Sequence, residues 1–194
     1  MSGAAAVSGT DGDVRRSTDL AAALRRATVD VVTANWPGEV YLYAAPGGDA
    51  TLLHALAVEF HVHIGDTGID DPAALVPAAL TQAIARSGAA ALMGCDAPYC
   101  RPDAIELTYE YLARGRNVIG PTERGGYYLI GLQQASAELF SIALGADAQA
   151  LAQLLTRAAA LGIEFEKLPP LRELDSPTDL SLVGRPLPVL RRLI

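Results

Sequence analysis

Five consecutive residues in the middle of the chain combine side-chain types that bind small polar ligands. They are Glu123, Arg124, Gly125, Gly126 and Tyr127. Paired glycines let a backbone approach a ligand where a Cβ atom would clash. The carboxylate, guanidinium and phenol beside them offer charge and hydrogen bonds. Because apolar residues precede and follow this turn, we expect two buried strands joined by the wall of a binding site.

A second candidate is Asp96, which follows the apolar stretch 90–93 and precedes Pro98 by two residues. An acid at the carboxyl end of a central strand is well placed to hold a divalent cation, and Mg²⁺ prefers carboxylate and substrate phosphate oxygens. A plain turn after a strand is the alternative, since Asp and Pro are both common in turns. These residues alone leave both interpretations open.

A third candidate is Asp175, which stands just before a helix-start pattern. Ser176 can cap that helix, Pro177 suits its first position and Asp179 complements the helix dipole. The pattern explains those three residues structurally. Asp175 lies outside the cap and is free to point into a cleft.

The composition predicts one globular domain. The chain has 194 residues, of which 51% are apolar and 19% charged. A net charge of −7 argues against nonspecific binding of nucleic acid. No apolar run reaches the roughly 20 residues that a membrane span needs, and the N-terminus lacks the pattern of a signal peptide. We therefore expect a cytoplasmic protein; its apolar content would suit a homodimer without showing one.

Two residue types limit the available chemistry. Lys167 is the only lysine among 15 basic residues, so arginine has to supply any cationic contact to phosphate. Cys95 and Cys100 are the only cysteines, and no second Cys/His pair completes a zinc site around them. We interpret them as structural thiols.

Periodicity and turn residues predict alternating helices and strands. Helices are expected from residue 17 to the Pro-Gly pair at 37–38 and over 49–58, 72–86, 102–114, 136–142, 147–161 and 176–183. Strands are expected over 40–44, 60–64, 89–93, 127–132 and 163–168, with another beginning at 117–119. Such alternation predicts a mostly parallel sheet covered on both faces, with ligands beyond the carboxyl ends of its strands.

Three segments in this order, Gly94–Pro98, Gly120–Gly131 and Glu173–Leu180, resemble a known family. It is the bacterial glycosyltransferase-like family with the GT-A (nucleotide-diphospho-sugar transferase) fold, of the selenodomain-associated or arsenosugar-biosynthesis type. The similarity is clear over about residues 88–183. The long glycine-tyrosine segment is its specific part.

The resemblance implies a single three-layer α/β/α domain over residues 1–194, with a nucleotide-binding half followed by an acceptor half. It implies transfer of a glycosyl or nucleotidyl group from a nucleotide or nucleotide-sugar to a small-molecule acceptor. Asp96 and Asp175 would be catalytic and would bind Mg²⁺ or Mn²⁺. The five residues 123–127 would contact the acceptor.

Two departures from the family pattern leave alternatives open. The loop expected to hold nucleotide phosphates keeps Gly12 and the basic Arg15 and Arg16, but lacks the family's proline and lysine. Its preceding strand is reduced to residues 4–7, so residues 1–17 can also be read as a disordered polar N-terminus. The packing of the tail 184–194 is not predicted.

The second departure is Arg124, which stands where the family has an acid. One hypothesis is an active transferase in which Arg124 recognises an acidic acceptor. The other is an inactive relative that binds a ligand or a partner protein.

Overall fold

The computed structural model describes residues 11–44, 48–69, 71–95, 97, 99–140 and 149–172. The predicted strand at 4–7, the predicted helix at 176–183 and the tail 184–194 lie outside these residues, as do Asp96 and Asp175.

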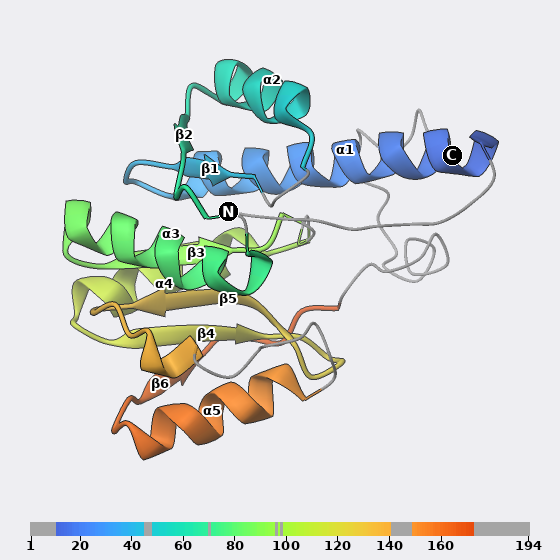
Figure 1. Ribbon diagram of the computed structural model, residues 1–194. Coiled ribbons are helices and arrows are strands. Elements are labelled where there is room, and N and C mark those ends of the chain that lie inside the picture. Colours follow the sequence, from blue (N-terminus) through green and yellow to red (C-terminus); the bar gives the residue numbers. More distant parts are fainter. Residues whose placement is uncertain are drawn as a thin grey trace.

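Helices and strands alternate through the described chain (Figure 1). The helices are α1 (Asp11–Asn35), α2 (Ala50–Phe60), α3 (Pro72–Ser87), α4 (Pro102–Ala113), the 3₁₀ helix η1 (Glu138–Phe140) and α5 (Ala150–Ala160). The strands are β1 (Tyr41–Tyr43), β2 (His63–Gly65), β3 (Ala90–Met93), β4 (Asn117–Pro121), β5 (Tyr127–Leu132) and β6 (Phe165–Lys167). The predicted order of these elements is confirmed, with η1 as a single turn within the helix expected at 136–142.

Helix α1 begins earlier than predicted. It starts at Asp11, so Gly12, Arg15 and Arg16 lie in its first turns and not in a loop. Acids are favoured in the first turn of a helix because they complement its dipole, and the sequence carries Asp11 and Asp13 there. The expectation of a phosphate loop over these residues is therefore wrong in its local structure.

The strands form two groups. Strands β1 and β2 pair in parallel, and the other four form a sheet in the order β3-β5-β4-β6. In that sheet β5 is antiparallel to both of its neighbours, and only β4 and β6 pair in parallel. The four-stranded sheet is therefore mixed, and the expectation of a mostly parallel sheet is not confirmed for it. Strands β3, β4 and β6 still point the same way, with β5 inserted against them.

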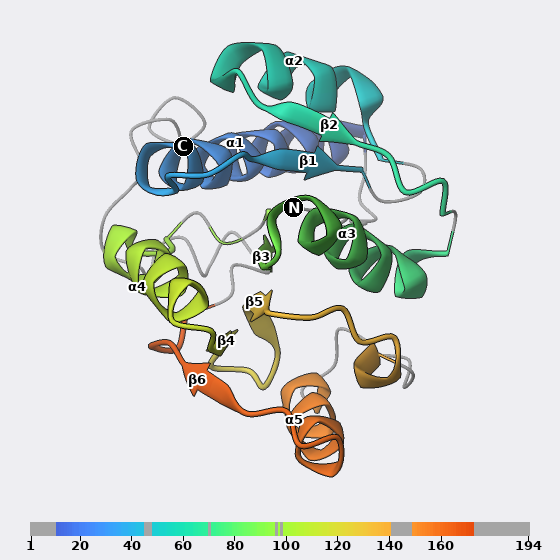
Figure 2. The same cartoon turned by 90° about the vertical axis from the view of Figure 1, so that its left-hand side faces the viewer.

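Helices pack on both faces of the four-stranded sheet (Figure 2). On one face α1, α2 and α4 cover a core that includes Val29, Ile105 and Val118. On the other face α3 and α5 cover a second core, which includes Leu80 and Leu154. The ends of the strands therefore lie between two packed layers of helices. This fixes the positions of the loops that follow the strands.

A β-bulge where β4 and β5 pair sets the direction of one tyrosine. Gly120 pairs with Leu129 but Pro121 pairs with Tyr127, so Tyr128 is the extra residue. The bulge turns Tyr128 toward the α1/α4 core, whereas Tyr127 packs against the α3/α5 core. The Tyr128 ring then lies directly over Gly120: a Cβ atom added there would be 2.5 Å from Cζ of the ring.

Replacing Gly120 by alanine should therefore destabilise the protein by about 1–3 kcal/mol, the usual cost of overpacking a core. Denaturant unfolding measures the change. The cost should fall sharply in a Tyr128→Ala background, because the clash partner is then gone. An equal cost in both backgrounds would show that the ring is not the reason for a glycine at this position.

Candidate functional site

The segment that leads to Asp96 and the glycine turn meet at one end of the strands, where β3 ends and β5 begins. Because β5 runs against β3, it begins where β3 ends. The N–H of Gly94, directly after β3, donates a hydrogen bond to the carbonyl of Tyr128 at 2.9 Å. The chain therefore leaves β3 toward position 96 beside the start of β5.

The glycine turn is held closed by one threonine. The N–H of Thr122 donates to the carbonyl of Gly126 at 2.9 Å, and the N–H of Gly126 returns a bond to Oγ1 of Thr122 at 2.9 Å. Gly125 has φ +92°, a conformation that side chains strongly disfavour. Its carbonyl accepts a bond from the N–H of Leu151 at 2.9 Å, which ties α5 to the turn. The turn is a fixed structure and not a loose loop.

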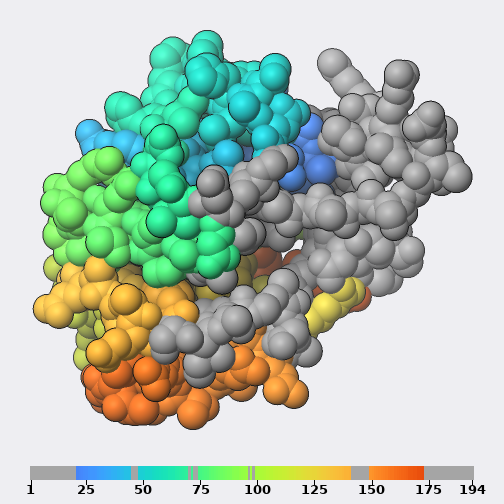
Figure 3. Space-filling view, in the orientation of Figure 1, coloured from blue at the N-terminus to red at the C-terminus, as the bar shows by residue number. Residues whose placement is uncertain are grey.

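The chain that leads to Asp175 joins the same turn from its other side. The N–H of Leu171 donates to the carbonyl of Pro121, and the N–H of Glu123 donates to the carbonyl of Leu171, each at 3.0 Å. Figure 3 shows the turn, in yellow, beside the end of the described chain, in red. All three segments selected from the sequence thus reach one edge, although Asp96 and Asp175 themselves lie outside the described residues.

The side chains of the turn divide into exposed and packed groups. Glu123 and Arg124 are exposed, so both can meet a ligand from solvent. Tyr127 is half-buried against the α3/α5 core. Burial raises the pKa of the Tyr127 phenol to about 12, so it is protonated at neutral pH and can donate a hydrogen bond. By contrast, Gly12, Arg15 and Arg16 lie on α1, a separate element from the turn.

Three positioning residues were not predicted from the sequence. Thr122 closes the turn, and Tyr128 is buried with its hydroxyl donating to the carbonyl of Pro169 at 3.3 Å. Burial raises the pKa of the Tyr128 phenol, and the nearby Cys100 and Asp103 side chains add to the shift. The third is Thr28, which holds the segment after β3.

Thr28 is fully buried on α1, and its Oγ1 lies 3.0 Å from the carbonyls of Leu24 and Cys95. It therefore anchors the backbone one residue before position 96 to helix α1. A threonine on an otherwise apolar helix face is a usable sequence signal, because a buried hydroxyl needs an acceptor. Tyr128 gives no such signal, because its direction depends on the bulge.

The two cysteines fit a structural role. Cys95 and Cys100 are both buried and neither is in a disulfide. Burial, and secondarily the charge of Asp103, raises the pKa of the Cys100 thiol to about 12, which makes it unreactive at neutral pH. Both belong to the core under α1, α2 and α4.

Replacing Thr122 by valine should open the glycine turn. It leaves the N–H of Gly126 without its acceptor, at a cost of about 1–3 kcal/mol. Hydrogen exchange should show faster exchange of the Gly126 amide. Thr156→Val is the control, because the Thr156 hydroxyl donates locally to the carbonyl of Ala152 on the exposed face of α5. Unchanged exchange at Gly126 would contradict the role of the threonine.

Comparison with known proteins defines the family. Residues 28–144, more than half of the chain, match the family described as "Uncharacterized protein conserved in bacteria (DUF2064)". The chain belongs to this family. The match includes β3, the glycine turn and β5, but ends before α5. No curated protein matches the chain.

The fold of this DUF2064 chain is similar to that of a solved structure. That structure is a protein of Desulfovibrio desulfuricans G20 whose name proposes that it is a nucleotide-diphospho-sugar transferase. The two share 22% sequence identity with a TM-score of 0.71, over 84% of this chain and 73% of the other. The chain therefore shares its fold with that protein. Across the described residues, no helix is both long and apolar enough to cross a bilayer.

Proposed function

We propose that the protein is a metal-dependent transferase that moves a glycosyl or nucleotidyl group from a nucleotide-sugar or nucleotide to a small acceptor. The observation that carries this proposal is the convergence of three chain segments at one sheet edge. The segment leading to Asp96 is bonded to Tyr128, and the segment leading to Asp175 is bonded to the turn. The fold type supports it. Within this class we favour the selenodomain-associated or arsenosugar-biosynthesis type, on the sequence resemblance.

Asp96 and Asp175 are the proposed ligands of Mg²⁺ or Mn²⁺. Their carboxylates are the hard oxygen donors that these ions prefer. Among the described residues, no group of three His, Cys, Asp or Glu side chains could hold a metal. A bound ion would offset negative charge on the phosphates of the donor.

The glycine turn is proposed to contact the acceptor. Glu123 and Arg124 face solvent, and Tyr127 can donate a hydrogen bond. The guanidinium of Arg124 suits an acceptor that carries a carboxylate or a phosphate, because it can bind either group through two parallel hydrogen bonds. Gly125 and Gly126 would let that acceptor reach the backbone.

The donor phosphates are proposed to meet the start of α1. The N–H groups at a helix N-terminus, together with the dipole, attract anions. Gly12, Arg15 and Arg16 lie in those first turns, so the helix would replace the loop expected from the family.

The alternative is an inactive relative that binds a ligand or partner. One observation favours it: residues 11–16 are helical where the family pattern predicts a phosphate loop. A ligand could still bind beside the glycine turn, but the loop that would hold the donor phosphates would be missing.

Calorimetric titration distinguishes these two functions. UDP-, GDP- and CDP-sugars are each titrated with Mg²⁺, with Mn²⁺ and with EDTA. The transferase proposal predicts that at least one of them binds, and that EDTA abolishes its binding. Binding of equal affinity with metal and with EDTA, without transfer of a group to water or to an acceptor, would support the inactive relative. No binding under any condition would contradict the transferase proposal.

A further inference from the structure

Arg25, on helix α1, is a half-buried arginine without a partner. Among the arginines whose side chains the structure describes, it alone makes no hydrogen bond, ion pair or ring contact. The neighbouring Arg26 shows the usual arrangement, because its guanidinium pairs with Glu59 and lies over the ring of Phe60. Polar groups that lose water on folding are normally paired within the protein. An unpaired, half-buried guanidinium therefore points to a partner from outside the chain.

Arg25 lies beside the segment that leads to Asp96. It precedes Thr28 by three residues, which is about one helical turn. Oγ1 of Thr28 lies 3.0 Å from the carbonyl of Cys95, and Cys95 lines the same small cavity as Arg25. Because Cys95 comes directly before Asp96 in the chain, Arg25 lies at the end of β3 where we propose the metal.

This small cavity lies where β1 and β3 end, and it suits an anion. Gly48 and Asp49 line it and are both exposed, so a ligand can reach it from solvent. Asp49 is the only acid among the described residues that line it. Its Oδ1 caps α2 by accepting from the N–H groups of Thr51 and Leu52, at 2.9 and 3.0 Å. The helix end thus offsets the charge of Asp49, and Arg25 remains as the cation of the cavity.

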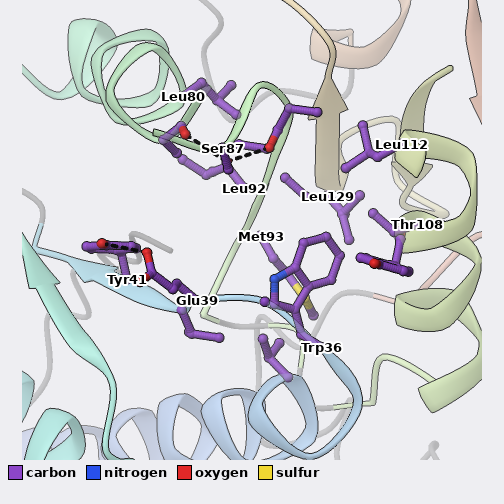
Figure 4. A pocket seen from close by; sticks show the side chains of 18 of the residues that line it. Trp36, Glu39, Tyr41, Leu80, Ser87, Leu92, Met93, Thr108, Leu112 and Leu129 are labelled. Carbon is purple, nitrogen blue, oxygen red and sulfur yellow. Dashed lines mark hydrogen bonds between the residues drawn. The ribbon is translucent and has the colours of Figure 1, made fainter. Parts of the chain in front are cut away.

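The larger cavity of the protein offers different chemistry (Figure 4). It has a volume of about 850 Å³ and is lined mainly by apolar side chains, among them Leu80, Leu92 and Leu129. Its arginine, Arg86, already lies over the ring of Tyr41, 4.8 Å from the ring centroid. An anion there would exchange water for apolar walls and for a cation that already has a partner. The small cavity beside Arg25 is therefore the better place for a phosphate.

We propose that Arg25 binds the diphosphate of the donor next to the metal. The inference rests on the function proposed above, in which the donor binds with an ion at Asp96. A guanidinium can bind two phosphate oxygens through parallel hydrogen bonds. A diphosphate is common to a nucleotide-sugar, a nucleoside diphosphate and inorganic pyrophosphate, so all three should share this contact.

The geometry of α1 places Arg25 closer to the proposed ion than the two arginines of its first turns. A helix rises about 1.5 Å per residue, so Arg25 stands about 4.5 Å along the helix axis from Thr28. Arg15 and Arg16 stand about 18–20 Å from Thr28 on the same measure. Arg25 therefore adds a contact beside the ion to those proposed for Arg15 and Arg16.

Titration calorimetry on the full chain with Mn²⁺ tests the proposal, with UDP, GDP, CDP and inorganic pyrophosphate as probes. Arg25→Gln should weaken every probe that the unaltered protein binds by about tenfold to a hundredfold, because a charged hydrogen-bonded contact to phosphate is lost. Arg25→Lys should recover part of the affinity, since lysine keeps the charge but lacks the planar fork of donors.

Arg26→Gln is the matched control. Arg26 is the next residue of the same helix, but it already pairs with Glu59, so its loss should leave the affinity for every probe unchanged. Thermal unfolding without ligand separates binding from a structural role. Arg25→Gln should leave the melting temperature unchanged or raise it, because no bond within the protein is lost. A lower melting temperature would assign Arg25 a structural role and overturn the proposal.

The remaining outcomes separate the role of Arg25 from the transferase proposal. Equal affinities of Arg25→Gln and the unaltered protein for the nucleotides would overturn the role of Arg25 and leave the transferase proposal intact. Binding of pyrophosphate but of no nucleotide, lost in Arg25→Gln, would support the phosphate contact and contradict the transferase. An unaltered protein that binds none of the four probes would contradict both.

Discussion

Replacing Asp96 by asparagine should remove metal-dependent binding of the nucleotide-sugar and lower transfer by roughly a thousandfold or more. The change keeps the size of the side chain but removes the charge that a hard cation requires. A bound metal contributes several kcal/mol of charge stabilisation, and about 1.36 kcal/mol corresponds to a factor of ten. Calorimetry with Mn²⁺ and the donor measures the binding, and product formation measures the transfer.

Asp103→Asn is the control for this variant. Asp103 is an exposed acid in the first turn of α4, where Arg101 donates to both of its carboxylate oxygens at 3.0 and 2.5 Å. It should retain donor binding. Combining Asp96→Asn with Asp175→Asn should cost little more than either alone, because two ligands of one ion do not act independently. Additive losses would contradict a shared metal.

Replacing Arg124 by aspartate should raise the KM for the acceptor and lower kcat/KM by about tenfold to a hundredfold. A hydrogen bond to a charged group contributes about 1.5–3 kcal/mol, and the new carboxylate would repel an anionic acceptor. Donor binding should change little, since Arg124 lies on the turn that is proposed to contact the acceptor. Steady-state kinetics with the acceptor varied separate the two effects.

Arg114→Asp is the matched charge reversal, because Arg114 is an exposed arginine after α4 that pairs with Glu110. It should leave the KM for the acceptor unchanged. Equal or improved activity of Arg124→Asp would show that Arg124 does not recognise the acceptor and that an acid suits this position better.

The sequence predicted most helices and strands because their signals are local. The helix over 72–86 and the strand over 89–93 lie within one or two residues of α3 and β3. Gly88, between them, has φ +78°, as a helix-ending glycine commonly does. Such boundaries depend on residues a few positions apart, so they can be read without knowing the fold.

The expectation of a mostly parallel sheet is not confirmed for the four-stranded sheet, although a signal for the antiparallel direction of β5 was present. Only the five residues 122–126 separate β4 from β5, whereas parallel neighbours need a connection of about a dozen residues or more. The short turn therefore requires an antiparallel hairpin. Counting the residues between those two strands would have corrected the prediction.

The position of the glycine turn in the fold was predicted for a similar reason. The glycine turn carries its own local pattern, and it lies next to the segment after β3, as expected for a shared sheet edge. The role of Tyr128 depends on a bulge, which no local pattern reports. Thr28 does carry a local signal, but the partner of its hydroxyl is set by packing between distant elements. The roles proposed for Asp96 and Asp175 stay predictions.

A crystal structure with Mn²⁺ and a nucleotide-sugar tests the central claim most directly. Anomalous scattering identifies the Mn²⁺ position without ambiguity. The account predicts one ion held by carboxylate oxygens of Asp96 and Asp175, with the donor phosphates on it and the sugar facing the turn 122–126. An ion or donor bound elsewhere, with neither acid in contact, would contradict it.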